Sequence, residues 1–184
     1  MKKIKRRFLA MGICLAVLFC SLAPVQPVNA AAKTINLTVR YKGKNVTFEA
    51  YRNPNTSKTK IVKKAKTYAA VKKAWGKANV VEGGVGGYAY TWKSGKTEIW
   101  FNTDEKGKRS ESILIDIKNK KATLCGIKVG MSKKQALRKL RKQWGKKNVS
   151  TTKNQILVQT YPGLIPMTFD LKSGKIRSIY YMHS

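Results

Sequence analysis

"KKAWGKANV" at residues 72–80 returns as "RKQWGKKNV" at residues 141–149, and this near-repeat decides how the chain is predicted to fold. Further matches follow in the same order, since Trp92 corresponds to Tyr161 and Phe101 corresponds to Phe169. The offset between the copies shrinks by single steps, as happens when turns lose residues. A duplicated structural unit is therefore expected.

Each copy carries the pattern of a short amphipathic helix that ends at a glycine. The apolar residues leading to Trp144 recur at helical spacing, which places them on one face. Ser132 followed by Gln135 forms a capping box at the start of this helix. Gly145 suits the left-handed conformation that follows a last helical turn. Trp144, and Trp75 in the first copy, are predicted to anchor the core.

Alternating segments after each helix predict antiparallel strands at 88–92, 97–102 and 110–117, and again at 156–161, 166–171 and 176–181. A further alternating pair, 34–41 and 46–50, predicts an N-terminal β-hairpin that turns at Lys42 and Gly43. The expected fold class is α+β. It consists of two tandem helix-plus-antiparallel-meander repeats, with helices packed on one face of an antiparallel sheet, preceded by the N-terminal β-hairpin.

The first thirty residues have the pattern of a cleaved signal peptide. Five basic residues between Lys2 and Arg7 precede an apolar run, and small residues stand at positions −3 and −1 of a cleavage site between Ala30 and Ala32. The apolar run is shorter than the roughly 20 residues that span a bilayer, which disfavours an uncleaved anchor. We expect a secreted protein, extracellular or associated with the cell envelope.

The predicted organisation has four parts. They are a cleaved signal peptide at 1–30, the N-terminal β-hairpin at 31–56, a first repeat at 57–117 with a helix and three strands, and a second repeat at 118–184 with a strand, a helix and three strands.

The charge of the chain is its strongest functional signal. It has 39 Lys and Arg against 8 Asp and Glu, a formal net charge of +31, which falls to +26 when the five basic residues of the signal peptide are removed. So large a charge repels itself and favours anionic partners. An anionic cell-wall polymer or membrane surface is expected, with nucleic acid as an alternative. The predicted anion-binding residues surround the two helices: Lys63, Lys64, Lys72, Lys73, Lys77, Lys133, Lys134, Arg138, Arg141, Lys142, Lys146 and Lys147.

A second hypothesis is a protein-partner module, such as an inhibitor of a secreted enzyme. Outward-facing aromatic side chains on strands serve as anchors in protein interfaces. The candidates for this role are Tyr88, Tyr90, Trp92, Tyr180 and Tyr181.

Signals for catalysis are weak, so the chain is predicted to be noncatalytic, with no cofactor and no metal. The sole histidine, His183, is expected in a mobile tail. Adjacent Asp104 and Glu105 leave a wall-polymer hydrolase as the least favoured alternative. Cys125 lacks nearby metal-ligating residues and is predicted to be a small buried hydrophobe in a strand.

The pattern resembles β-lactamase-inhibitory-protein-like modules and the similar single unit of small outer-membrane assembly lipoproteins. Residues 130–132 (GMS) and 144–146 (WGK) carry the resemblance, together with the strands that end at Tyr181. Residues 66–117 carry it more weakly. Tandem units of this kind, in secreted proteins of Gram-positive bacteria, imply the fold given above and leave the partner open.

Overall fold

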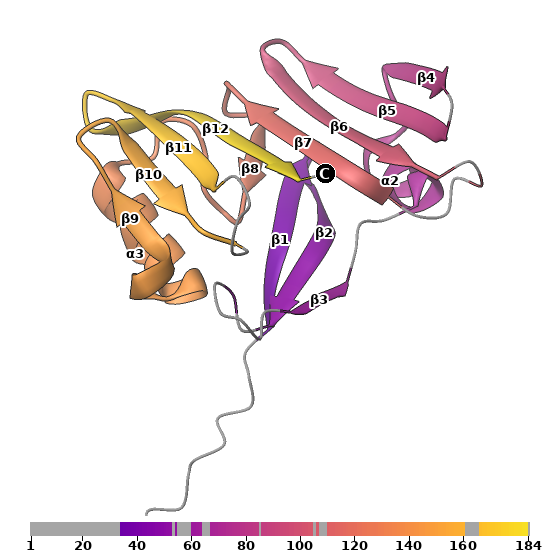
Figure 1. Cartoon of the computed structure of the whole chain (residues 1–184). Coiled ribbons are helices and arrows are strands. Elements are labelled where there is room, and N and C mark those ends of the chain that lie inside the picture. Colours follow the sequence, from indigo (N-terminus) through magenta and orange to yellow (C-terminus); the bar gives the residue numbers. More distant parts are fainter. Residues whose placement is uncertain are drawn as a thin grey trace, which may run out of the picture. The chain divides into compact units, whose positions relative to one another are not determined.

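The computed structural model describes residues 34–183, with gaps at 53, 55–59, 64–66, 85, 105, 107–109 and 161–165 (Figure 1). The predicted signal peptide therefore lies outside the described residues. So do Lys64 and Glu105 from the sets of candidate residues.

Two antiparallel sheets contain the strands of the described chain. The smaller sheet has the order β3–β2–β1–β8, with β1 at Thr34–Tyr41, β2 at Lys44–Arg52, β3 at Lys60–Lys63 and β8 at Ala122–Leu124. The larger sheet has the order β4–β5–β6–β7–β12–β11–β10–β9. Its strands are β4 (Val80–Gly84), β5 (Gly87–Ser94), β6 (Thr97–Thr103), β7 (Ser110–Ile117), β9 (Val149–Thr151), β10 (Gln155–Val158), β11 (Met167–Lys172) and β12 (Lys175–His183).

The helices of the described chain are short. Helix α2 spans Tyr68–Trp75 and precedes β4, whereas α3 spans Lys133–Trp144 and is followed by a 3₁₀ turn, η1, at Lys146–Asn148. The start of α3 agrees with the capping prediction, because the Ser132 hydroxyl accepts a hydrogen bond from the Gln135 backbone N–H. Gly145 and Gly76 end the two helices with positive φ, as glycine allows.

The predicted fold class is wrong. The described chain is mostly antiparallel sheet, and it is not two helix-plus-meander repeats with helices packed on one face of a sheet. Helices of 8 and 12 residues are too short to cover an eight-stranded sheet. The predicted N-terminal hairpin is also not a separate leading element, because β1 and β2 belong to a second sheet together with β3 and β8.

Strand β2 supplies much of the apolar contact that the helices do not provide. The Phe48 ring lies 5.7 Å from that of Trp75 at the end of α2, and 5.6 Å from Phe101 on β6. The Tyr51 ring lies 5.8 Å from that of Trp144 at the end of α3. Each large apolar side chain buried in this way stabilises the fold by roughly 1.5–3 kcal/mol. Both tryptophans are core residues, as predicted.

A β-bulge in β2 changes the direction of its side chains. Thr38 pairs with Thr47 and Leu37 pairs with Glu49, which leaves Phe48 as the extra residue. A bulge shifts the alternation of the residues that follow it. Regular alternation would place Glu49 opposite to Phe48, toward solvent, whereas the bulge leaves both side chains buried.

None of the helices in the described ranges combines the length and the apolar character needed to cross a bilayer.

Candidate functional site

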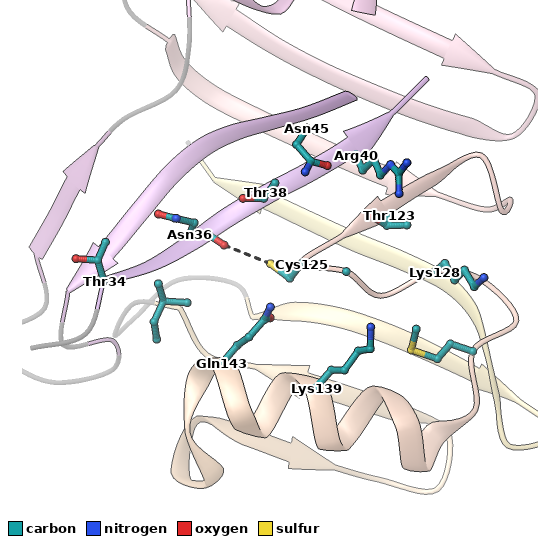
Figure 2. Close-up of a pocket in the computed structure, with 13 residues that line it drawn as sticks. Thr34, Asn36, Thr38, Arg40, Asn45, Thr123, Cys125, Lys128, Lys139 and Gln143 are labelled. Atoms are coloured by element: carbon teal, nitrogen blue, oxygen red, sulfur yellow. Dashed lines mark hydrogen bonds between the residues drawn. The ribbon is translucent and has the colours of Figure 1, made fainter. Parts of the chain in front are cut away.

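A groove of about 670 Å³ lies between strand β1, the turn after β8 and helix α3 (Figure 2). We call it the β1–α3 groove. Its walls come from segments that are distant in sequence, since β1 begins at Thr34 and α3 ends at Trp144.

The first wall follows from the alternation of β1. Ile35, Leu37 and Val39 point into the core, and the intervening residues turn the opposite face toward the groove. That face presents Thr34, Asn36, Thr38 and Arg40, and it is continued by Asn45, which pairs with Arg40 across the hairpin.

The opposite wall is one face of α3. Lys139 and Gln143 are spaced one helical turn apart and both point toward the groove in Figure 2. Lys128, in the segment between β8 and α3, lies at one end of the groove. Arg40, Lys128 and Lys139 are all exposed.

The floor of the groove is a tight turn. Cys125 and Gly126 both have positive φ, and hydrogen bonds connect Leu124 with Ile127 in both directions. This is the geometry of a two-residue hairpin turn. Cys125 is buried, as predicted, but it lies in the turn and not within a strand. Burial raises the pKa of its thiol to about 11.

The electrostatic character of the groove is cationic. Among the described residues, its lining includes Arg40, Lys128 and Lys139 and no Asp or Glu. Within the described ranges, the lysine–carboxylate ion pairs are Lys93–Glu98 and Lys118–Asp116, and neither contributes to the groove. The three groove cations are therefore not neutralised by carboxylates of the described chain.

The structure places the predicted anion-binding residues mainly on exposed surface outside the groove. Exposed side chains are those of Lys72, Lys73, Lys77, Lys134, Arg138, Lys142, Lys146 and Lys147. Lys133 and Arg141 are half-buried, and the Lys133 ammonium donates to the Thr152 carbonyl oxygen over 2.7 Å. Lys63 belongs to β3, but its side chain lies outside the description. None of these residues lines the β1–α3 groove.

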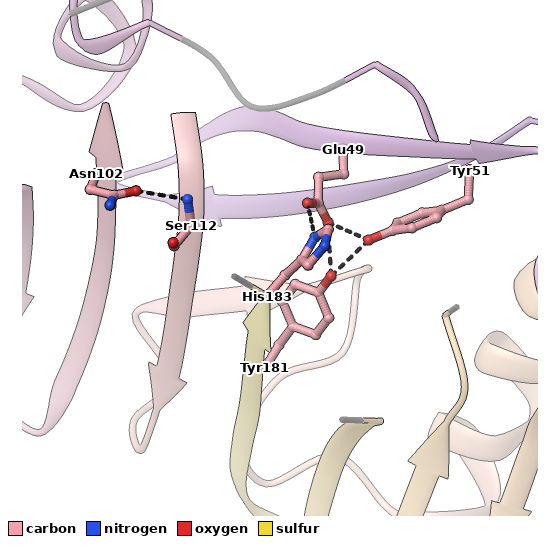
Figure 3. A network of polar contacts seen from close by, with 6 residues as sticks. All are labelled: Glu49, Tyr51, Asn102, Ser112, Tyr181 and His183. Carbon is pink, nitrogen blue, oxygen red and sulfur yellow. Dashed lines mark hydrogen bonds and ion pairs between the residues drawn. The ribbon is translucent and has the colours of Figure 1, made fainter. Parts of the chain in front are cut away.

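A second polar cluster lies in the core between β2 and β12 (Figure 3). Glu49 Oε1 contacts His183 Nδ1, and Glu49 Oε2 accepts hydrogen bonds from the hydroxyls of Tyr51 and Tyr181. The two hydroxyl oxygens are 2.7 Å apart. This Glu49 cluster connects the four-stranded sheet with the eight-stranded sheet.

The protonation states of the Glu49 cluster follow from its surroundings. Burial alone would raise the pKa of Glu49, but hydrogen bonds from His183 and Tyr51 outweigh burial and hold it below the ordinary value. Burial raises the pKa of Tyr51 and of Tyr181, and the Glu49 charge adds to this effect. The carboxylate is therefore ionised, and both tyrosines remain protonated donors.

His183 differs from its prediction. It ends strand β12 and contacts Glu49, so it does not lie in a mobile tail. A carboxylate beside an imidazole also occurs in hydrolases, where the imidazole activates a nucleophile. In this cluster both tyrosine hydroxyls also contact the carboxylate, which links β2 of the smaller sheet with β12 of the larger sheet.

The predicted partner-binding aromatics divide into two groups. Tyr90, Trp92 and Tyr181 are buried in the core, whereas Tyr88 is exposed and Tyr180 is half-buried. The structure therefore does not bring the five rings together on an outer surface.

In the described part of the chain, no group of three or more His, Cys, Asp or Glu side chains is arranged to hold a metal ion.

Comparisons with known proteins add no family to this description: no protein-family model matches the chain, and no curated protein or solved structure matches it either. The resemblance to β-lactamase-inhibitory-protein-like modules stays a prediction.

Sequence reasoning missed both clusters. The polar side of the groove could have been found, because Thr34, Asn36, Thr38 and Arg40 alternate with apolar residues in β1. The position of α3 opposite that face has no local signal. The burial of Glu49 depends on the bulge in β2, which a regular alternation pattern does not indicate.

Proposed function

We propose that this chain is a secreted, noncatalytic, cationic binding module that is retained at the bacterial cell envelope through anionic polymers or lipids. The observation that carries the proposal is the excess of surface cations without carboxylate partners. The chain has a formal net charge of +31, and its described lysines form ion pairs only at Lys93 and Lys118. Counter-ion release from an anionic surface would then favour binding.

The groove supports a binding role. It gathers cations and uncharged hydrogen-bonding side chains on two walls, and its floor is a hydrogen-bonded turn. The Glu49 cluster supports a noncatalytic role, because its hydroxyls and its imidazole contact one carboxylate. An inhibitor of a secreted enzyme is less well supported, because Tyr90, Trp92 and Tyr181 are buried.

Retention is tested with purified bacterial cell walls at increasing salt. The expected result is binding at low salt. The logarithm of the binding constant should then decline linearly with the logarithm of the salt concentration, as for other polycation–polyanion associations. Walls stripped of teichoic acid and vesicles with or without anionic lipid identify the source of the negative charge. Absence of binding to walls and to anionic vesicles at low salt would contradict the proposal.

Export is tested separately by expressing the full chain in a Gram-positive host. The N-terminus of the protein recovered from the medium and from the envelope should begin between residues 31 and 33. Recovery of the uncut chain from the cytoplasm alone would contradict the exported part of the proposal.

A further inference from the structure

We infer that the β1–α3 groove is the site that binds the envelope polymer, and that the ligand is a polyol-phosphate chain whose phosphates contact Arg40, Lys128 and Lys139. The inference rests on the proposed function and deepens it. Two of its three residues, Arg40 and Lys128, lie outside the two helices whose surfaces were predicted to bind anions.

The cations of the groove suit phosphate groups. Arg40 offers a planar guanidinium that can donate two parallel hydrogen bonds to one phosphate. Lys139 projects from α3 on the other wall, and Lys128 lies at one end. A ligand in the groove would therefore meet positive charge from three separate segments, and no carboxylate of the described residues lines the groove to repel it.

The uncharged lining suits the polyol that connects the phosphates. The amides of Asn36, Asn45 and Gln143 provide donors and acceptors, and Thr123 provides a hydroxyl. Hydroxyl groups of a polyol need both kinds of partner. Inorganic phosphate alone would use only the donors.

The length of the groove favours a chain over a single ion. Its β1 wall runs from Thr34 to Arg40, which corresponds to roughly 20 Å of extended strand. Residues that alternate on this face are roughly 7 Å apart. A repeating ligand can place successive groups against such a row, whereas a single phosphate would occupy a small part of it.

The absence of aromatic lining separates this site from a nucleic-acid site. Proteins that hold single-stranded nucleic acid stack bases on aromatic side chains. No Phe, Tyr or Trp of the described ranges lines the groove. A membrane site is disfavoured too, because the exposed large hydrophobic residues of the described ranges are Val81, Tyr88 and Met182, and none of them lines the groove.

The test compares two triple variants that lose the same charge. The groove variant is R40Q/K128Q/K139Q, and the control is K96Q/K153Q/K172Q, whose three lysines are exposed and lie outside the groove. Binding of an oligo(glycerol phosphate) is measured by calorimetry at several salt concentrations. Circular dichroism confirms that both variants are folded, as expected for changes at exposed side chains.

The groove variant should bind at least about tenfold more weakly than the native chain at low salt. The slope of its log binding constant against log salt concentration should decrease in magnitude by about 2, since each of three lost phosphate contacts on a single-stranded polyanion contributes about 0.7. The control should change by less than about threefold. Equal losses in the two variants would overturn the groove assignment while leaving wall binding, and so the proposed function, intact.

Two further arms test the class of ligand. Single-stranded DNA with the same number of phosphates, and vesicles containing phosphatidylglycerol, should bind more weakly than the oligo(glycerol phosphate), and their binding should be equally affected by both triple variants. The opposite result is that DNA or vesicles bind more tightly than the oligo(glycerol phosphate) and lose affinity only in the groove variant. That result would assign the groove to that ligand and overturn the polyol-phosphate inference. Failure of the native chain to bind both cell walls and anionic vesicles would instead count against the proposed function.

Discussion

Replacement of Glu49 by Gln tests whether the Glu49 cluster holds the two sheets together. The substitution keeps the size of the side chain and removes its negative charge. The tyrosine hydroxyls and the His183 imidazole then lose their charged acceptor, in a site where Glu49 is only 4% exposed. Hydrogen bonds to a charged group contribute about 1.5–3 kcal/mol each, so weakening those of Tyr51, Tyr181 and His183 together should destabilise the protein by about 3–5 kcal/mol.

The effect should be measured by thermal and urea unfolding at neutral pH. For a domain of this size, a loss of about 3–5 kcal/mol lowers the melting temperature by roughly 10 °C. Glu98→Gln is the matched control, because the Lys93–Glu98 pair is 3.8 Å long and both side chains are about half exposed. An exposed pair contributes under about 1 kcal/mol, so this control should unfold close to the native chain.

Equal stability of the Glu49→Gln and Glu98→Gln variants would refute this reasoning. Tyr51→Phe provides an internal check, since it removes one hydroxyl and leaves the carboxylate with Tyr181 and His183. Its cost should be smaller, at about 1.5–3 kcal/mol for one hydrogen bond to a charged group.

Three other predictions concern pH, the thiol and the backbone. The pKa of Glu49 is lower in the folded state than in the unfolded state. Its contribution to stability is therefore present above the unfolded pKa of about 4.3 and is lost as the pH falls through the folded pKa. The difference in unfolding free energy between the native chain and Glu49→Gln should consequently narrow in acid. A gap that widens in acid would contradict this sign. Because burial raises the pKa of Cys125 to about 11, a thiol reagent should label it slowly in the folded protein at neutral pH and rapidly in denaturant. Rapid labelling of the folded chain would show that the turn opens. Gly87→Ala should destabilise the protein far more than Gly86→Ala, because a Cβ at Gly87 would lie 1.8 Å from the Thr103 carbonyl oxygen. A Cβ at Gly86 would meet no atom within 4 Å, so that substitution should cost only about 1 kcal/mol for its backbone conformation. Urea unfolding of the two variants compares these costs, and equal midpoints would contradict the close approach.

Local patterns predicted the elements better than their assembly. The Ser132 cap, the helix that ends at Trp144 and the turn at Lys42 and Gly43 depend on neighbouring residues, and each lies where its pattern indicates. The fold class failed because it depends on which apolar faces pack together. The pattern did not indicate that β1 and β2 would cover the sheet in place of longer helices.

The candidate site shows the same limit. Charge counts indicated an anionic partner, but they directed attention to the many lysines around the helices. The β1–α3 groove brings together Arg40, Lys128 and Lys139 from three segments. Because these segments are far apart in the sequence, no local pattern indicates that the three residues line one groove. His183 and Glu49 are likewise brought together only by tertiary contacts across the two sheets.

The position of β12 has a consequence for synthesis and for the proposed export. This strand pairs with β7 on one side and with β11 on the other, so it joins the two halves of the eight-stranded sheet, β4–β7 and β9–β11. It is also the last strand of the described chain to leave a ribosome. Pairings such as His183 with Ile113 cannot form earlier, and contacts over such sequence separations slow folding. A nascent chain would stay open until its closing strand emerged, which is the state that a membrane translocation channel accepts.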